Sequence, residues 1–199
     1  MILVYKENTV YVDPFLGCIG WPYDQLAGYA VIIGRSPLAR AASGLYDYYF
    51  MGEREERNPI DLIEWCFDAS IDVKGLEFVH KYSPEHERIV KEWNEPRRGR
   101  RFFVYQAFQS TGSLVSYHVT NLMRVAHAGC LHGFKETRAI EELSLFQKSQ
   151  IPGVTHDKYP IVTALAYAVN HLGKLGQREE FYEDEVKRDV GKHRYATSY

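Results

Sequence analysis

A strand that runs into a small polar turn and then into a helix most constrains the fold of this chain. The stretch VYQAFQSTG, residues 104–112, ends an apolar run that begins at Phe102, and a helix-like pattern starts at Leu114. Such corners are typical of α/β proteins, in which ligands gather at the carboxyl ends of strands. This corner carries Gln106 and Ala107 but no acid, base or nucleophile. The sequence therefore predicts the shape of a site without its reactive group.

The other apolar runs predict a mixed sheet covered by helices. Runs 2–5 and 9–12 predict a hairpin, or one strand entered after a turn, and together with runs 27–34 and 44–52 they predict an antiparallel meander. A loop rich in glycine and aromatic residues is expected between residues 14 and 26. A short strand is expected at 75–82. Helices are expected over residues 58–70, 83–94, 113–129, 135–149 and 160–176.

Length and composition favour one globular α/β domain. The 199 residues carry a formal net charge of −2 and 45% apolar residues, which excludes a disordered chain and a strongly basic field. We expect a domain over residues 1–176 and a charged, peripheral tail over 177–199. The three cysteines are far apart in the sequence, which favours buried, reduced thiols. No apolar run is long enough for a membrane span, so we expect a cytoplasmic protein.

Acidic residues near predicted strand and helix ends are the candidate metal ligands. Asp13 follows the run 9–12 and could hold a metal ion, or Asp13-Pro14 could simply end the strand as a turn. Asp157 precedes the helix that starts at Pro160, where a carboxylate could bind metal or only interact with the helix dipole. Glu77, a further candidate metal ligand, and Asp24 could each be a second acid, or either could equally be a solvent-exposed residue.

A basic cluster is the candidate nucleic-acid contact. Arg97, Arg98, Arg100 and Arg101 form the densest group of positive charges in the chain. The cluster could contact phosphates, or it could be a solvated turn. Cys130 near His132 is a weak indication of a thiol nucleophile, and a buried cysteine at a helix end is the alternative interpretation.

Taken in order, these elements resemble the nuclease domain of the large terminase subunits of tailed phages and herpesviruses, which has an RNase H-like fold. The resemblance covers residues 10–172 and is carried by four segments: VYVDP (10–14), AGYAVIIG (27–34), VYQAFQSTGSLVSYHVTNLM (104–123) and HDKYPIVTALAYAV (156–169). It implies a mixed β-sheet with α-helices on both faces. It also implies a two-metal site that binds Mg²⁺ or Mn²⁺, in which Asp13 is the first ligand.

The chain departs from the family pattern at two of the expected acids. The carboxylate expected near the end of the middle strand falls on Ala107, and the second aspartate of the closing His-Asp-Asp group falls on Lys158. Alanine offers no ligand, and a lysine ammonium repels a cation that would bind beside it. Glu77, Asp24 or Asp157 would have to substitute.

Three hypotheses follow. The first is a metal-dependent DNA endonuclease of the terminase type, with Asp13 and Asp157 as catalytic ligands and the arginine cluster on DNA. It would work in the cytoplasm of a host cell with double-stranded DNA, an ATPase motor domain and portal or capsid proteins. The second is a catalytically silent RNase H-like module that binds DNA or a partner of the packaging motor. The third is an unrelated α/β protein, in which strands 9–12 and 102–106 are not adjacent.

Overall fold

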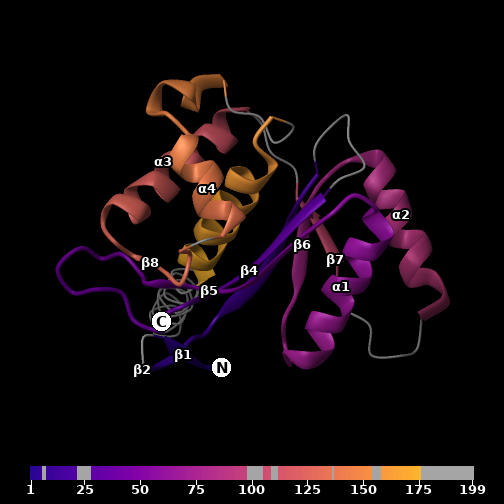
Figure 1. The fold of residues 1–199 in the computed structure, drawn as a ribbon, viewed down its shortest axis with the longest axis horizontal. Coiled ribbons are helices and arrows are strands. Elements are labelled where there is room, and N and C mark those ends of the chain that lie inside the picture. Colours follow the sequence, from indigo (N-terminus) through magenta and orange to yellow (C-terminus); the bar gives the residue numbers. More distant parts are fainter. Residues whose placement is uncertain are drawn as a thin grey trace, which may run out of the picture.

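Helices cover both faces of a mixed β-sheet (Figure 1). The computed structural model describes residues 1–5, 8–21, 28–97, 105–108, 112–135, 137–153 and 158–175. The helical elements are α1 (Pro59–Asp72), α2 (Pro84–Asn94), η1 (Glu95–Arg97), α3 (Gly112–His127), α4 (Arg138–Leu145), η2 (Lys148–Gly153) and a closing helix, 160–175. The expected tail, 177–199, lies outside the described residues.

The main sheet has six strands in the order β7-β6-β3-β4-β5-β8. Their bounds are β3 (Phe15–Gly20), β4 (Gly28–Arg35), β5 (Tyr48–Glu56), β6 (Phe78–Lys81), β7 (Tyr105–Phe108) and β8 (Leu131–His132). Strands β3, β4 and β5 form an antiparallel meander, and β6 and β7 continue the sheet parallel to β3 on its other side. At the far edge, β8 pairs with β5 only at Tyr48 and Tyr49.

The first strand of the meander is not the predicted one. Strands β1 (Ile2–Tyr5) and β2 (Asn8–Tyr11) pair with each other in a separate two-stranded sheet. Strand 9–12 is therefore not adjacent to β7, so the adjacency that the terminase-type hypotheses required is wrong, and the arrangement is the one that the third hypothesis predicts. Strand β3 takes the central place instead, and it comes from the segment that was expected to be a loop.

The glycines that suggested a loop allow other groups to approach β3 closely. A Cβ atom on Gly17 would lie 2.3 Å from the ring of Phe78, and one on Gly20 would lie 2.3 Å from the carbonyl oxygen of Pro160. Glycine inside a strand often marks such an approach rather than a break. Every residue of β4, and all of β3 except the partly buried Phe15, is buried, as expected for strands covered on both faces.

Each face of the sheet has its own hydrophobic core. On one face, Ile19, Ile32 and Phe78 pack against apolar residues of α1 and α2. On the other face, Cys18 and Val79 pack against α3 and the helix 160–175, as the two helical layers of Figure 1 indicate. Among the described residues, no helix is long and apolar enough to cross a membrane.

Side chains cap two of the helix starts. The Asn58 side chain accepts a hydrogen bond from the backbone N–H of Ile60 (3.0 Å) at the start of α1, and Thr137 caps α4 in the same way. Ser83 precedes α2 but makes no capping hydrogen bond with its side chain. The helix expected over 135–149 is instead the short α4 followed by η2.

Candidate functional site at the carboxyl edge of the sheet

The carboxyl ends of β3, β6 and β7 meet at one edge of the sheet. These strands are parallel, and their register places Ile19 beside His80 and His80 beside Ala107. Ala107 thus lies at the carboxyl edge of the sheet, and β6 separates it from the end of β3. Ligand sites of α/β sheets form at such edges.

The helix 160–175 begins at this same edge. Its first residue, Pro160, places its carbonyl oxygen against Gly20 so closely that even a methyl group would clash. Just before the helix, the Lys158 ammonium lies 5.2 Å from the centre of the Tyr159 ring. The segment that carries Lys158 therefore approaches the carboxyl end of β3.

A hydrogen-bonded chain of side chains fills the edge between β3, β6 and α2. The indole N–H of Trp21 donates to Nδ1 of His80 (3.1 Å), and Nε2 of His80 lies 3.1 Å from Oε2 of Glu87. Since Nδ1 accepts from Trp21, a neutral His80 carries its proton on Nε2 and donates it to the Glu87 carboxylate. The other oxygen of Glu87 lies 3.0 Å from the Lys91 ammonium.

Stacking holds the tryptophan in place. The Trp21 side chain is 1% exposed, and its ring stacks on His86 with centroids 4.3 Å apart and an interplanar angle of 10°. Nδ1 of His86 lies 3.0 Å from the Ser83 hydroxyl. The next strand leaves room for the indole, because a Cβ on Gly28 would lie 2.4 Å from it. A ring face and the polar atom of Trp21 are thus engaged.

Burial keeps the histidines of this edge neutral. It lowers the pKa of His80 to about 4, although the Glu87 carboxylate opposes this change. Burial also lowers the pKa of His86, again against an opposing carboxylate, that of Glu85. At neutral pH, the edge therefore presents uncharged imidazoles whose polar atoms are largely used within the protein.

The described residues of this edge do not fit a two-metal centre. Two divalent cations require several oxygen ligands from carboxylates that converge within a few Å. Within the described parts of the chain, no group of three or more His, Cys, Asp and Glu side chains is placed to hold a metal ion. The carboxylate that reaches His80 is Glu87, and its charge is already balanced by Lys91.

Asp13 lies at the opposite end of β3. Its backbone N–H donates to the carbonyl oxygen of Arg35, the last residue of β4 (2.9 Å), so it stands at the amino end of β3. Gly20 is roughly 20 Å further along the strand at about 3.3 Å per residue. Metals of a shared centre lie only about 4 Å apart. The expected grouping of Asp13 with Ala107 at one cleft is therefore wrong.

Of the other candidate acids, Glu77 lies within the described residues and Asp157 and Asp24 lie outside them. Glu77 is exposed at the amino end of β6, where its carbonyl oxygen accepts a hydrogen bond from the N–H of Gly17 (2.9 Å). It is thus also remote from the carboxyl edge. Asp157 and Asp24 lie outside the described residues, so their roles stay predictions. His156 is outside them as well.

Arg97 is the one described member of the basic cluster. Its guanidinium lies 3.6 Å from the centre of the Trp93 ring and donates to the Trp93 carbonyl oxygen. It therefore holds the end of α2 as well as carrying a positive charge. Arg98, Arg100 and Arg101 lie outside the described residues.

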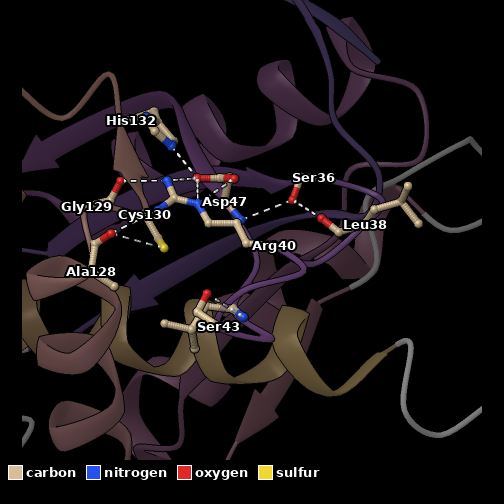
Figure 2. Close-up of polar contacts among 10 residues, drawn as sticks. Ser36, Leu38, Arg40, Ser43, Asp47, Ala128, Gly129, Cys130 and His132 are labelled. Carbon is tan, nitrogen blue, oxygen red and sulfur yellow. Dashed lines mark hydrogen bonds and ion pairs between the residues drawn. The ribbon is translucent and has the colours of Figure 1, made fainter.

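A second polar cluster, which the sequence did not indicate, ties the β4–β5 connection to the end of α3 (Figure 2). Arg40 binds both oxygens of the Asp47 carboxylate and donates to the carbonyl oxygens of Ala128 and Gly129, each at 2.9 Å. Nε2 of His132 lies 2.5 Å from Asp47. Burial of Asp47 would raise its pKa, but the hydrogen bonds from Arg40 and His132 outweigh this and lower it.

This cluster stabilises the fold and does not activate a nucleophile. Burial raises the pKa of the neighbouring Cys130 thiol, which points to the carbonyl oxygen of Ala128 at 3.7 Å. A thiol with a raised pKa is a poor nucleophile. Cys130 is therefore a buried structural cysteine, and the His132 imidazole contacts the Asp47 carboxylate rather than the thiol.

Comparison with known proteins identifies no relative. No protein-family model matches the chain, and no curated protein matches it.

Proposed function

We propose that this protein is an RNase H-like module of the DNA-packaging type that binds DNA or a packaging-motor partner without two-metal hydrolysis. Strand 9–12 is not adjacent to β7, which is the outcome that the third hypothesis predicts. The RNase H-like fold is nevertheless supported by the antiparallel meander β3-β4-β5 with β3 in the central place, by the strands β6 and β7 that continue the sheet parallel to β3, and by helices on both faces. The approach of the helix 160–175 to the end of β3 adds support. The packaging context rests on the sequence resemblance alone.

The observation that carries the proposal is the Trp21–His80–Glu87 chain. It occupies the edge where the nuclease family needs convergent carboxylates, and its hydrogen bonds are satisfied inside the protein. The neighbouring position on β7 is Ala107. Mg²⁺ and Mn²⁺ have no described ligand set at this edge, so a binding role needs fewer assumptions than hydrolysis.

DNA is the proposed partner because of the arginine run 97–101. Contacts between arginines and phosphates are electrostatic, so affinity for double-stranded DNA should fall steeply as salt concentration rises. Binding would be measured by fluorescence anisotropy with a labelled duplex, in EDTA. Replacing Arg98, Arg100 and Arg101 together with glutamine should weaken binding by at least tenfold, since each phosphate contact contributes to the salt-dependent affinity.

A matched control is Arg57→Gln with Lys74→Gln, which removes exposed positive charges outside the arginine run. If the triple variant and the control bind DNA equally well, DNA recognition by this segment is refuted. In parallel, the parent is incubated with supercoiled plasmid and Mn²⁺. Plasmid cleavage that persists after further purification of the protein and is abolished by EDTA would refute the proposal of a catalytically silent module.

Hydrolysis remains a second candidate for one reason. The described residues Lys158 to Pro160 lie at the carboxyl edge, and Asp157 directly precedes them. If the plasmid is cut, Asp157→Asn and Asp24→Asn should abolish cutting, whereas Asp13→Asn should not, because Asp13 lies at the other end of β3.

A further inference from the structure

A polar cavity lies at the amino end of the sheet, on the face covered by α3 and the helix 160–175. It has a volume of about 130 Å³ and opens between the segment 44–48, the middle of α3 and the end of the helix 160–175. Tyr48, on its wall, pairs with Arg35 at the end of β4, so the cavity is at the end of the sheet opposite to His80. It is a separate feature from the carboxyl edge.

Two positive charges line the cavity, and none of its described lining residues carries a carboxylate. Arg124 contributes from α3 and Lys174 from the end of the helix 160–175. Both side chains are exposed, and within the described residues neither makes an ion pair. Lys174 lies 5.8 Å from the centre of the Tyr117 ring, on the cavity wall. The nearby Asp47 carboxylate is already bound by Arg40 and His132.

Neutral hydrogen-bond donors complete the lining. Asn121 uses one N–H to donate to Oδ1 of Asn170 (3.1 Å), which leaves its second N–H. Asn170 is fixed in turn, because it donates to the carbonyl oxygens of His118 and Ala166. The hydroxyls of Tyr46 and Tyr117 also belong to residues of the wall. The cavity is thus rich in donors.

A further cation, Arg35, lies against Tyr46 of the cavity wall. Arg35 is 5% exposed, donates to the carbonyl oxygen of Leu172 (2.6 Å) and lies 4.0 Å from the centre of the Tyr46 ring. Burial raises the pKa of Tyr48 to about 12, and the charges of Arg35 and Arg124 act against this rise. Both cations are therefore close enough to influence a group on the wall.

We propose that this cavity binds a phosphate-type oxyanion, either free phosphate or the terminal phosphate of a nucleotide or oligonucleotide. Guanidinium and ammonium groups form strong, charge-assisted hydrogen bonds with such anions. Its volume corresponds to roughly four water molecules at about 30 Å³ each, which suits a group with four oxygens. The proposal does not depend on the proposed function, because the site lies at the other end of the sheet.

The test is calorimetric titration of the full chain with inorganic phosphate, against chloride at equal ionic strength. Saturable binding is expected in the parent, and Arg124→Gln and Lys174→Gln should each weaken it by about tenfold or more, because each removes a charge-assisted contact. Tyr117→Phe removes only a neutral donor, so its effect should be smaller. Arg57→Gln and Lys74→Gln are the matched controls, and both should bind like the parent.

Circular dichroism verifies that each variant is folded. If a charge variant does not fold, the remaining charge variant and Tyr117→Phe still test whether the cavity residues contribute to phosphate affinity. Competition by a 5′-phosphorylated oligothymidylate, compared with its 5′-hydroxyl form, identifies the source of the phosphate. Competition by the phosphorylated form alone supports a terminal phosphate, and competition by neither supports the free ion. The proposal is overturned if phosphate binds no better than chloride, or if the two charge variants bind like the controls.

Discussion

The two ends of the sheet use their polar groups in opposite ways. At the carboxyl edge, His80 and Glu87 are bonded to one another and to Trp21 and Lys91. At the amino end, Arg124 and Lys174 line a cavity without a described carboxylate partner. Polar groups that satisfy one another stabilise a fold, whereas convergent unpaired donors suit a ligand. The edge that looks like an active site is thus the less available of the two.

The largest expected effect is the loss of stability in Trp21→Ala, which tests whether the side chains at the carboxyl edge stabilise the fold. Trp21→Ala removes a fully buried side chain, its hydrogen bond to His80 and its stack on His86. We expect a loss of about 3–5 kcal/mol in the free energy of unfolding, as for other buried aromatic residues. Urea denaturation measures it, with the exposed Tyr82→Ala as control. A loss below about 1 kcal/mol would mean that the edge is not part of the packed core.

A pH titration of stability tests the neutral histidines. Burial lowers the pKa of His80 to about 4, and burial with the charge of Lys174 lowers that of His118 to about 4. The unfolded chain binds more protons between its histidine pKa, about 6.5, and pH 4, so stability is present above that window and is lost as pH falls through it. We expect a loss of about 2–3 kcal/mol per histidine. His80→Gln should reduce the dependence of the free energy of unfolding on pH between pH 6.5 and 4. An unchanged pH dependence would contradict the interpretation that His80 is buried in its neutral form.

A glycine pair tests the close approach of the helix 160–175 to β3. Gly20→Ala forces a methyl group to within 2.3 Å of the Pro160 carbonyl oxygen, whereas the same change at Gly52 meets its nearest neighbour only at 4.0 Å. Overpacking of this kind costs about 1–3 kcal/mol. Thermal unfolding should therefore show a clear loss for Gly20→Ala and little change for Gly52→Ala. Equal melting temperatures would place the helix elsewhere.

The smallest expected effect concerns the cluster in Figure 2. Arg40→Ala removes the hydrogen bonds to Asp47 and to the carbonyl oxygens of Ala128 and Gly129. Because Arg40 is partly exposed, water screens these contacts, and we expect a loss of about 1 kcal/mol. Denaturation midpoints at low and high salt measure it, with Arg57→Ala as control. A loss no larger than that of the control would show that the cluster contributes nothing.

Much of the fold could be predicted from local signals. An asparagine followed by a proline favours a helix start, and such a pair, Asn58 and Pro59, begins α1 as expected for the range 58–70. The glycine-bounded run at 27–34 likewise marked β4. The central strand β3 was missed because its Gly17 and Gly20 are the residues that also mark loops. These strand glycines differ from loop glycines in their close contacts with Phe78 and Pro160, which are distant in the sequence. A local sequence pattern cannot reveal such a contact.

The candidate site was harder to predict for the same reason. Asp13 follows a β-rich run, but within the described chain that run pairs with β1 alone, so the assumption that the run itself belongs to the main sheet was wrong. The residues that do meet at the edge, Trp21, His80 and Glu87, have no recognisable spacing in the sequence. Their association depends on strand order, which is a tertiary property. Ala107 lies near the end of a strand, as expected, but its place beside His80 of β6 was not predicted.

The short pairing of β8 with β5 has a consequence for how molecules of this protein meet. Beyond Tyr49, the outer side of β5 pairs with no strand of the described chain. An open strand edge invites a second chain to extend the sheet and begin an aggregate. Here the strand bulges at Met51 and continues into the charged run Glu53–Glu56, in which Glu53 also accepts a hydrogen bond from the backbone N–H of Arg138 (2.9 Å). The exposed edge thus carries its own protection against intermolecular sheet growth.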